Sequence, residues 1–238
     1  MQFNSGDWQI DVLIQGYPGK STQHGGLGWS TVALLRGHGR IVVLDGGGYG
    51  MRKPLVEALA KQGVKLSDVT DLLVSHLHHD HVVNWPMFRD ARIHVGRKEL
   101  AWALGVGWGE TAVPEHAVEA LSRWPTMQLM DDGQEVLPGI TAHLSPGHTP
   151  GHSAWIVHSG KDSAMMWGDT IHLPNVQMPH PDVTTIYDLD GALGARSRQQ
   201  ILDMCIADGI NALGAHLEFP GYARVVKNGN GFGFEYDF

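Results

Sequence analysis

The feature that most constrains this chain is a cluster of metal-binding side chains between His76 and His81. The stretch VSHLHHDHVVNW, from Val74 to Trp85, places four histidines and one aspartate in six consecutive positions. The cluster follows an apolar run, VTDLLVSH, whose length and composition are typical of a buried strand. We therefore expect it to begin where that strand ends, because loops at strand ends are where rigid scaffolds display functional side chains.

The spacing within the cluster predicts two half-sites. Side chains two positions apart point to the same side of an extended segment, so His76 and His78 can hold one ion. Asp80 and His81 lie beyond a bend and can reach a second ion, whereas His79 is expected to hold none. A structural zinc site is closed by four protein ligands, often cysteines, while a catalytic site keeps one position open. Imidazole and carboxylate without cysteine therefore favour a catalytic centre.

Three later segments can supply the missing ligands. SPGHTPGH presents His148, MMWGDTIH presents Asp169 and LGAHLEFPG presents His216, each where an apolar run stops and turn residues begin. Taken singly, each could be an ordinary turn residue. His152 is expected to support the site rather than to bind metal, and Asp45 could either orient a ligating histidine or cap a turn.

Together these motifs resemble the metallo-β-lactamase-fold hydrolase superfamily. The resemblance rests on H-x-H-x-D-H at His76 to His81, on the three later residues and on LDGG at Leu44 to Gly47. The motifs run from Asp45 to His216 and so cover most of the chain. The resemblance implies a single domain over residues 1–238, folded as a four-layer αββα sandwich of two mixed β-sheets with helices outside.

The resemblance also implies a centre of two divalent metal ions. In this arrangement the first ion is held by His76, His78 and His148, the second by Asp80, His81 and His216, and both by the bridging Asp169. Zinc is the default metal for such ligands, and manganese, iron or cobalt could occupy the same positions.

The implied activity is hydrolysis by a metal-bridging hydroxide. The segments WGDTIHLPNVQMPHPD and DLDGALGARSRQQILD resemble the branch that contains acyl-homoserine lactonases and methyl-parathion-type organophosphate hydrolases. Many lactonases of the superfamily carry tyrosine three residues after the bridging aspartate, where this chain has His172. We assign Asp80, Asp169 and His172 to catalysis, although an ordinary loop position remains the alternative for His172. The most favoured reaction is ring opening of a small lactone.

Several other activities fit the same ligands. A phosphotriester or aryl ester, or a thioester of the glyoxalase II kind, could be the substrate instead. A mononuclear-iron persulfide dioxygenase on the same fold would need only one metal, so the complete second half-site argues against it. A metal-binding or interaction domain without activity would be expected to have lost ligands, and none is lost here.

The composition of the chain limits the classes of binding partner that we expect. The formal net charge is -8, from 17 basic and 25 acidic residues, which argues against nucleic acid as a partner because phosphate binding needs a basic face. We see no signal-peptide pattern and no apolar stretch near the ~20 residues that a membrane span requires. A soluble, cytoplasmic protein is therefore expected. The single cysteine, Cys205, is expected to be buried, and the apolar, tryptophan-rich N-terminal half would permit a homodimer.

The remaining pattern alternates short strands and helices. Strands are expected over residues 8–16, 30–37, 40–45, 69–76, 91–96, 211–219 and 223–236, and helices over 53–63, 97–104, 115–124 and 190–209. Residues 128–147 are expected to form paired strands around a turn at Asp132-Gly133, and residues 153–169 a hairpin that turns at Ser159-Gly160.

Overall fold

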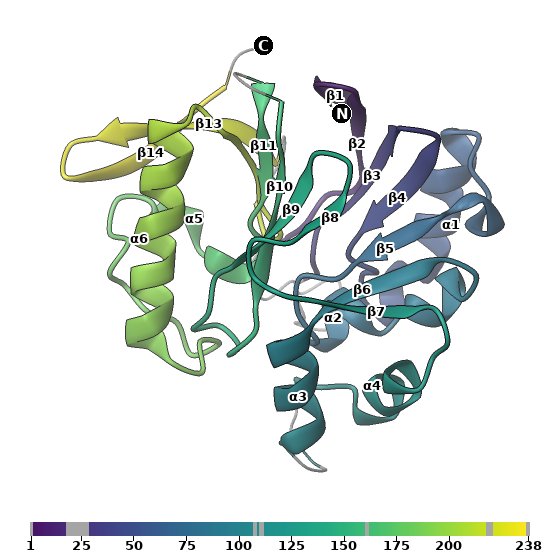
Figure 1. The fold of residues 1–238 in the computed structure, drawn as a ribbon. Helices are drawn as coiled ribbons and strands as arrows, with labels where there is room; N and C mark the ends of the chain where they lie inside the picture. The colour runs from purple at the N-terminus through teal and green to yellow at the C-terminus, as the bar shows by residue number, and fades with distance from the viewer. Residues whose placement is uncertain are drawn as a thin grey trace.

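Two β-sheets lie face to face and form the centre of the molecule (Figure 1). The structure is a computed structural model that describes residues 2–17, 29–106, 109, 112–159, 162–217 and 221–236. The first sheet takes its strands in chain order, antiparallel as far as β4 and parallel from there on. These strands are β1 (Gln2–Ser5), β2 (Trp8–Ile14), β3 (Val32–Gly37), β4 (Arg40–Leu44), β5 (Asp71–Leu73), β6 (Arg92–Gly96) and β7 (Met127–Met130).

The second sheet is built from the other half of the chain. Its neighbouring strands are antiparallel except for the parallel pair β11 and β12, so this sheet is also mixed. Its strands are β8 (Glu135–Leu137), β9 (Ile140–Leu144), β10 (Ser153–Val157), β11 (Ala164–Met166), β12 (Asn211–Leu213), β13 (Tyr222–Asn228) and β14 (Gly231–Glu235).

Helices cover the outer faces of both sheets. On the first sheet they are α1 (Arg52–Lys61), α2 (His79–Val82), α3 (Arg97–Gly105) and α4 (Glu115–Ser122), and on the second sheet α5 (Pro174–Gln177) and α6 (Gly191–Ala207). α1 begins after the short 3₁₀ turn Tyr49–Met51 and ends before Gly63, whose φ of +70° lets the chain turn back. α6 begins at Asp190, whose carboxylate accepts a hydrogen bond from the Leu193 amide.

Side-chain alternation along the strands creates three apolar layers. In β3, Leu34 packs outward with Leu59 of α1, whereas Leu35 points inward to the layer shared with Trp155 of β10. A third layer packs the outer face of β10 and β11 against Ile201, Leu202 and the buried Cys205 of α6. Three apolar layers between four layers of secondary structure confirm the predicted αββα sandwich.

One predicted strand pairing is wrong. β7 does not pair with β8 across Asp132-Gly133, but lies parallel to β6 in the first sheet. β8 pairs with β9 in the second sheet, and their hairpin turns at Pro138-Gly139. The turn at Asp132-Gly133 exists, but it carries the chain from one sheet to the other.

Other differences are smaller. The edge strand β1 was not predicted, and α2 places Asp80 and His81 on a helical turn rather than in a loop. β10 and β11 pair as predicted, while Gly160 of the expected turn lies outside the described residues. Among the helices of the described residues, none combines the length and the apolar character needed to cross a membrane.

Candidate metal centre

Three imidazoles form the first half-site. The segment that follows β5 brings His76 and His78 beside the loop that carries His148. Nε2 of His148 lies 3.1 Å from Nε2 of His76 and 2.9 Å from Nδ1 of His78. A proton can satisfy only one pair of nitrogens, whereas a metal ion can accept lone pairs from all three. The donor set therefore fits a metal ion.

The second half-site combines α2 with the loop after β12. Because α2 begins at His79, the backbone turns so that Asp80 and His81 face His216. Nε2 of His81 lies 3.7 Å and Nε2 of His216 lies 3.9 Å from Oδ2 of Asp80. Ligand atoms of these three residues lie within 4.8 Å of one another, a separation that one ion can span.

Asp169 lies between the two half-sites. It occupies the short 3₁₀ turn Gly168–Thr170, directly after β11. Its Oδ1 is 3.1 Å from Nε2 of His81, and its Oδ2 is 3.1 Å from Nε2 of His216 and 3.4 Å from Nε2 of His148. Oδ1 of Asp169 and Nε2 of His81 face each other in the buried cluster and have no other hydrogen-bond partner within the described part of the chain. A carboxylate oxygen and an imidazole nitrogen that converge in this way also fit a divalent cation.

Asp45 supports the second half-site. Its Oδ2 lies 2.8 Å from Nδ1 of His81, and it accepts hydrogen bonds from the amide and the hydroxyl of Ser75. The backbone of Asp45 has a φ of +56°, a conformation that costs energy in a residue other than glycine. Of the two predicted roles for Asp45, the structure therefore shows the orientation of a histidine, which leaves Nε2 of His81 free for a metal.

His152 is held away from the ligand positions. Its Nε2 accepts a hydrogen bond from the amide of Asp169 at 2.9 Å, so its Nδ1 must be the atom that donates to the carbonyl of Ser145 at 3.0 Å. A Cβ on Gly168, which has a φ of +54°, would lie 2.4 Å from Nε2 of His152. As predicted, His152 supports the site: it fixes the backbone of Asp169.

Burial and charge prepare the imidazoles for metal in two ways. Burial lowers the pKa of His76 and His148 well below the usual value and lowers the pKa of His78 to about 4, so these rings are neutral, as a ligand must be. Burial also acts to lower the pKa of His81 and His216, but the neighbouring carboxylates, Asp169 and then Asp80, together outweigh it and raise the pKa of both. In the metal-free chain the second half-site therefore holds its protons more tightly than the first.

His172 points into the same cluster. Its Nε2 lies 3.1 Å from Oδ2 of Asp169, and its ring stacks on that of His216 at a centroid distance of 5.5 Å. The side-chain oxygen of Gln177 accepts hydrogen bonds from the amides of His172 and Leu173, which fixes this loop. The structure thus places His172 at the centre, while its role in catalysis stays a prediction.

Several supporting residues escaped the sequence analysis. Oδ1 of Asp188 lies 3.6 Å from Nδ1 of His148, and Arg198 holds Asp188 from α6. Glu99 contacts both loops of the first half-site. An acid among Leu100, Trp102 and Ala103 on α3 was a signal that could have revealed Glu99, whereas nothing in the sequence marks Asp188. His79 belongs to none of the potential metal-binding groups among the described residues.

The burial of Glu99 predicts that the stability of the protein depends on pH. Its carboxyl is fully buried, and burial raises its pKa from 4.5 to about 7. The folded chain thus holds this proton more tightly than the unfolded chain, so the resulting stabilisation is complete below pH 4.5 and is lost as the pH rises through 7. The shift corresponds to about 3 kcal/mol. Denaturant unfolding of metal-free wild type and Glu99→Gln should show their free-energy difference changing by that amount across this window. A difference that is constant with pH would contradict the assignment.

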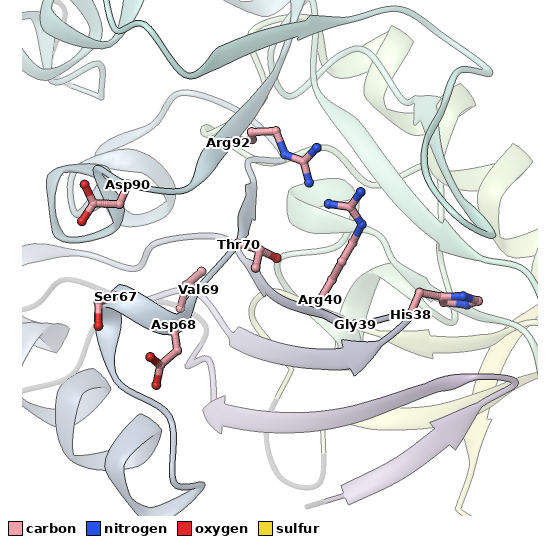
Figure 2. Close-up of a pocket in the computed structure, with 9 residues that line it drawn as sticks. All are labelled: His38, Gly39, Arg40, Ser67, Asp68, Val69, Thr70, Asp90 and Arg92. Atoms are coloured by element: carbon pink, nitrogen blue, oxygen red, sulfur yellow. The ribbon is translucent and has the colours of Figure 1, made fainter.

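A hollow at the other end of the first sheet is a different kind of site. It has a volume of about 580 Å³ and lies beside the residues that begin β4, β5 and β6, whereas the metal-site loops follow the ends of these strands. Figure 2 shows the guanidinium groups of Arg40 and Arg92 side by side, and both donate to the buried carboxylate of Asp71. Asp71 also contacts Nε2 of His94 at 3.0 Å. This network satisfies a buried charge and presents no converging metal ligands.

Comparison with known families agrees with this geometry. The profile described as the metallo-beta-lactamase superfamily matches residues 25–204. An N-acyl homoserine lactonase of Bacillus thuringiensis is 26% identical over 112 residues, which are 47% of this chain and 42% of that protein. Metallo-beta-lactamase domain-containing protein 1 of Xenopus laevis is 36% identical over 90 residues, 36% of each chain. The matched segment thus spans less than half the length of these curated relatives.

Solved structures share the fold over the whole chain. AidC, a dizinc quorum-quenching lactonase in complex with the product N-hexanoyl-L-homoserine, superposes with a TM-score of 0.86 at 21% identity, over 100% of this chain and 97% of that one. The hydrolase AbOPH of the beta lactamase superfamily gives a TM-score of 0.83 at 18% identity over the same shares. At these identities, the likeness shows the fold.

Proposed function

Because the chain belongs to the metallo-β-lactamase superfamily, we propose that it is a dinuclear metal-dependent hydrolase that opens the ring of a small lactone. The observation that carries the proposal is the position of Asp169 between two complete half-sites. The lactone is favoured by the curated N-acyl homoserine lactonases that match part of the chain.

Two of the groups of converging ligand atoms support a division into two ions. The first ion is assigned to His76, His78 and His148, the second to Asp80, His81 and His216, and Asp169 to both. When bound, such a metal pair supplies a water of lowered pKa and polarises the oxygen of the substrate. Zinc suits these nitrogen and oxygen donors.

The chain's own residues prepare the site for this chemistry. Asp45 orients His81 and His152 holds the backbone of Asp169, so the ligand atoms are in place before substrate arrives. His172 lies beside Asp169 and is assigned to donate a proton to the leaving oxygen. Its Nδ1 is buried and has no hydrogen-bond partner among the described residues.

The segment that follows His172 in the chain carries apolar and aromatic side chains. The amides of Leu189 and Asp190 donate to the carbonyls of His148 and Gly147, which holds the 185–190 loop against the first half-site. The ring of Tyr187 lies 5.5 Å from that of His172. Further exposed apolar residues lie between positions 173 and 189, namely Leu173, Val176, Val183, Ile186 and Leu189. Such a segment favours a lactone with an apolar substituent.

Metal analysis and a substrate panel test the proposal together. Purified protein should bind two divalent ions per chain and turn over lactones faster than aryl esters, phosphotriesters or thioesters. A single iron and no second metal would contradict the dinuclear centre. Turnover of phosphotriesters alone would leave the proposed dinuclear centre standing but would show that the lactone is the wrong substrate class.

Replacing His172 by phenylalanine should lower kcat about 100-fold or more while two ions remain bound. A general acid typically contributes at least that factor, and phenylalanine preserves the stacking on His216. The exposed His180, exchanged in the same way, provides the control. Unchanged kinetics in His172→Phe would remove His172 from the mechanism, and loss of metal would make it a ligand instead.

A further inference from the structure

A buried carboxylate joins the two loops of the first half-site. Glu99 lies in the first turn of α3, and its side chain is inaccessible to solvent. Its Oε1 accepts the amide of Leu77 at 2.9 Å, and its Oε2 accepts the hydroxyl of Thr149 at 2.7 Å and the amide of Gly151 at 3.1 Å. Three donors from two separate loops therefore converge on one side chain.

These contacts lie next to the ligands in the chain. Leu77 stands between His76 and His78, and Thr149 directly follows His148. The two loops are about 70 residues apart in sequence, since His76 and His148 are separated by 72 positions. A side chain that bonds to both loops thus constrains the distance between their imidazoles.

The packing leaves little freedom for the length of this side chain. A Cβ on Gly151 would lie 2.1 Å from the amide nitrogen of Glu99, so the loop after His148 rests directly on the backbone of α3. Aspartate would be one methylene too short to reach both loops. Glutamine would offer one acceptor oxygen and an NH₂ group, which cannot accept from Thr149 or Gly151.

We propose that Glu99 is a positioning residue that sets the spacing between the His76–His78 loop and the His148 loop and so determines the affinity of the first half-site for its ion. This inference rests on the proposed dinuclear centre. Burying a carboxylate costs free energy, and the three donors explain why Glu99 is nevertheless buried here. An apolar side chain in its place would leave these donors without a partner. Glu99 acts through the amides of Leu77 and Gly151 and the hydroxyl of Thr149, none of which belongs to a proposed ligand.

The test isolates each half-site in turn. In a His216→Ala background, the remaining affinity reports on the first ion, and in a His148→Ala background on the second. Zinc affinity is measured by competition with a chromophoric chelator. Glu99→Gln should lower the affinity about 10- to 100-fold in the first background, as expected when a partner behind the ligands is lost, and leave it unchanged in the second. A role confined to overall stability would affect both backgrounds alike.

Two further variants complete the design. Thr149→Val should weaken the same ion, and its effect should not add to that of Glu99→Gln, because both remove one shared bond. Thr149→Val also tests the inference if Glu99→Gln fails to fold. Asp71→Asn is the matched control: it alters an equally buried carboxylate at the other end of the sheet and should leave both affinities unchanged.

The outcomes separate the two proposals. Equal affinity of wild type and Glu99→Gln for the first ion would overturn the role of Glu99 while the dinuclear centre stands. A wild-type protein that binds fewer than two ions would overturn the dinuclear centre, and the inference on Glu99 with it.

Discussion

Replacing Asp169 by alanine should reduce lactone hydrolysis by more than about 100-fold and lower the number of bound ions below two. Loss of a partner behind a ligand already costs about 10- to 100-fold, so a carboxylate between both half-sites should cost more. Burial acts to raise the pKa of Asp169, but the charges of His216 and His81 hold it well below the usual range. The group is therefore an anion at neutral pH, and its removal takes away the one carboxylate that faces both half-sites among the described residues.

The matched control is Asp203→Ala, an aspartate on α6 that pairs with Lys227 at the surface. An exposed pair contributes little to stability, so this variant should keep its metal and its activity. Metal content by elemental analysis and kcat/KM for a lactone measure both effects. Full activity in Asp169→Ala would show that the bridging assignment is wrong.

Replacing Arg198 by methionine should destabilise the protein by about 3–5 kcal/mol, the cost of breaking a buried ion pair by removing one partner. The guanidinium is inaccessible to solvent and donates to the carbonyls of Thr170, Pro181 and Val183 as well as to Asp188. One side chain of α6 thus holds the turn that contains Asp169, the 181–183 segment and the carboxylate behind His148. Turnover should fall together with stability.

Methionine preserves the length of the arginine stem, so the loss reports on hydrogen bonds more than on volume. Arg196→Met, an exposed change two residues away on α6, is the control and should unfold as the wild type does. Denaturant unfolding of the metal-free proteins gives the free-energy difference. A change below about 1 kcal/mol, the value expected for an exposed ion pair, would contradict the structural account of Arg198.

The sequence indicated the candidate ligands of the centre because their residue types are unusual in combination. Four histidines around Asp80 have few structural explanations, and the turn residues around His148 and His216 mark strand ends. The four layers were implied by the resemblance to the superfamily and not by the strand pattern, since Leu34 and Leu35 of β3 are adjacent apolar residues that point to different cores. The ligand motifs are local, so a single sequence contains enough information to predict them.

The features that were missed depend on partners distant in sequence. The signal at Asp132-Gly133 is that of a hairpin turn, and only the parallel partner β6 shows that β7 belongs to the other sheet. The edge strand β1 is short and polar, and it exists because β2 lies beside it. Asp188 and Arg198 resemble any surface charges in the sequence. Their burial depends on how α6 packs, which no local pattern specifies.

Each half of the chain forms one sheet, and the chain passes from the first sheet to the second at Asp132-Gly133. Each proposed half-site takes ligands from both halves of the chain. An ion that binds only the assembled sandwich stabilises it by mass action, in proportion to the logarithm of free metal over the dissociation constant. Through this linkage the metal would also act as a folding cofactor. At a free metal concentration of 100 times the dissociation constant, each ion would add about 2.7 kcal/mol to the free energy of unfolding. A cell that limits metal would then regulate the abundance of the protein, and not only its activity.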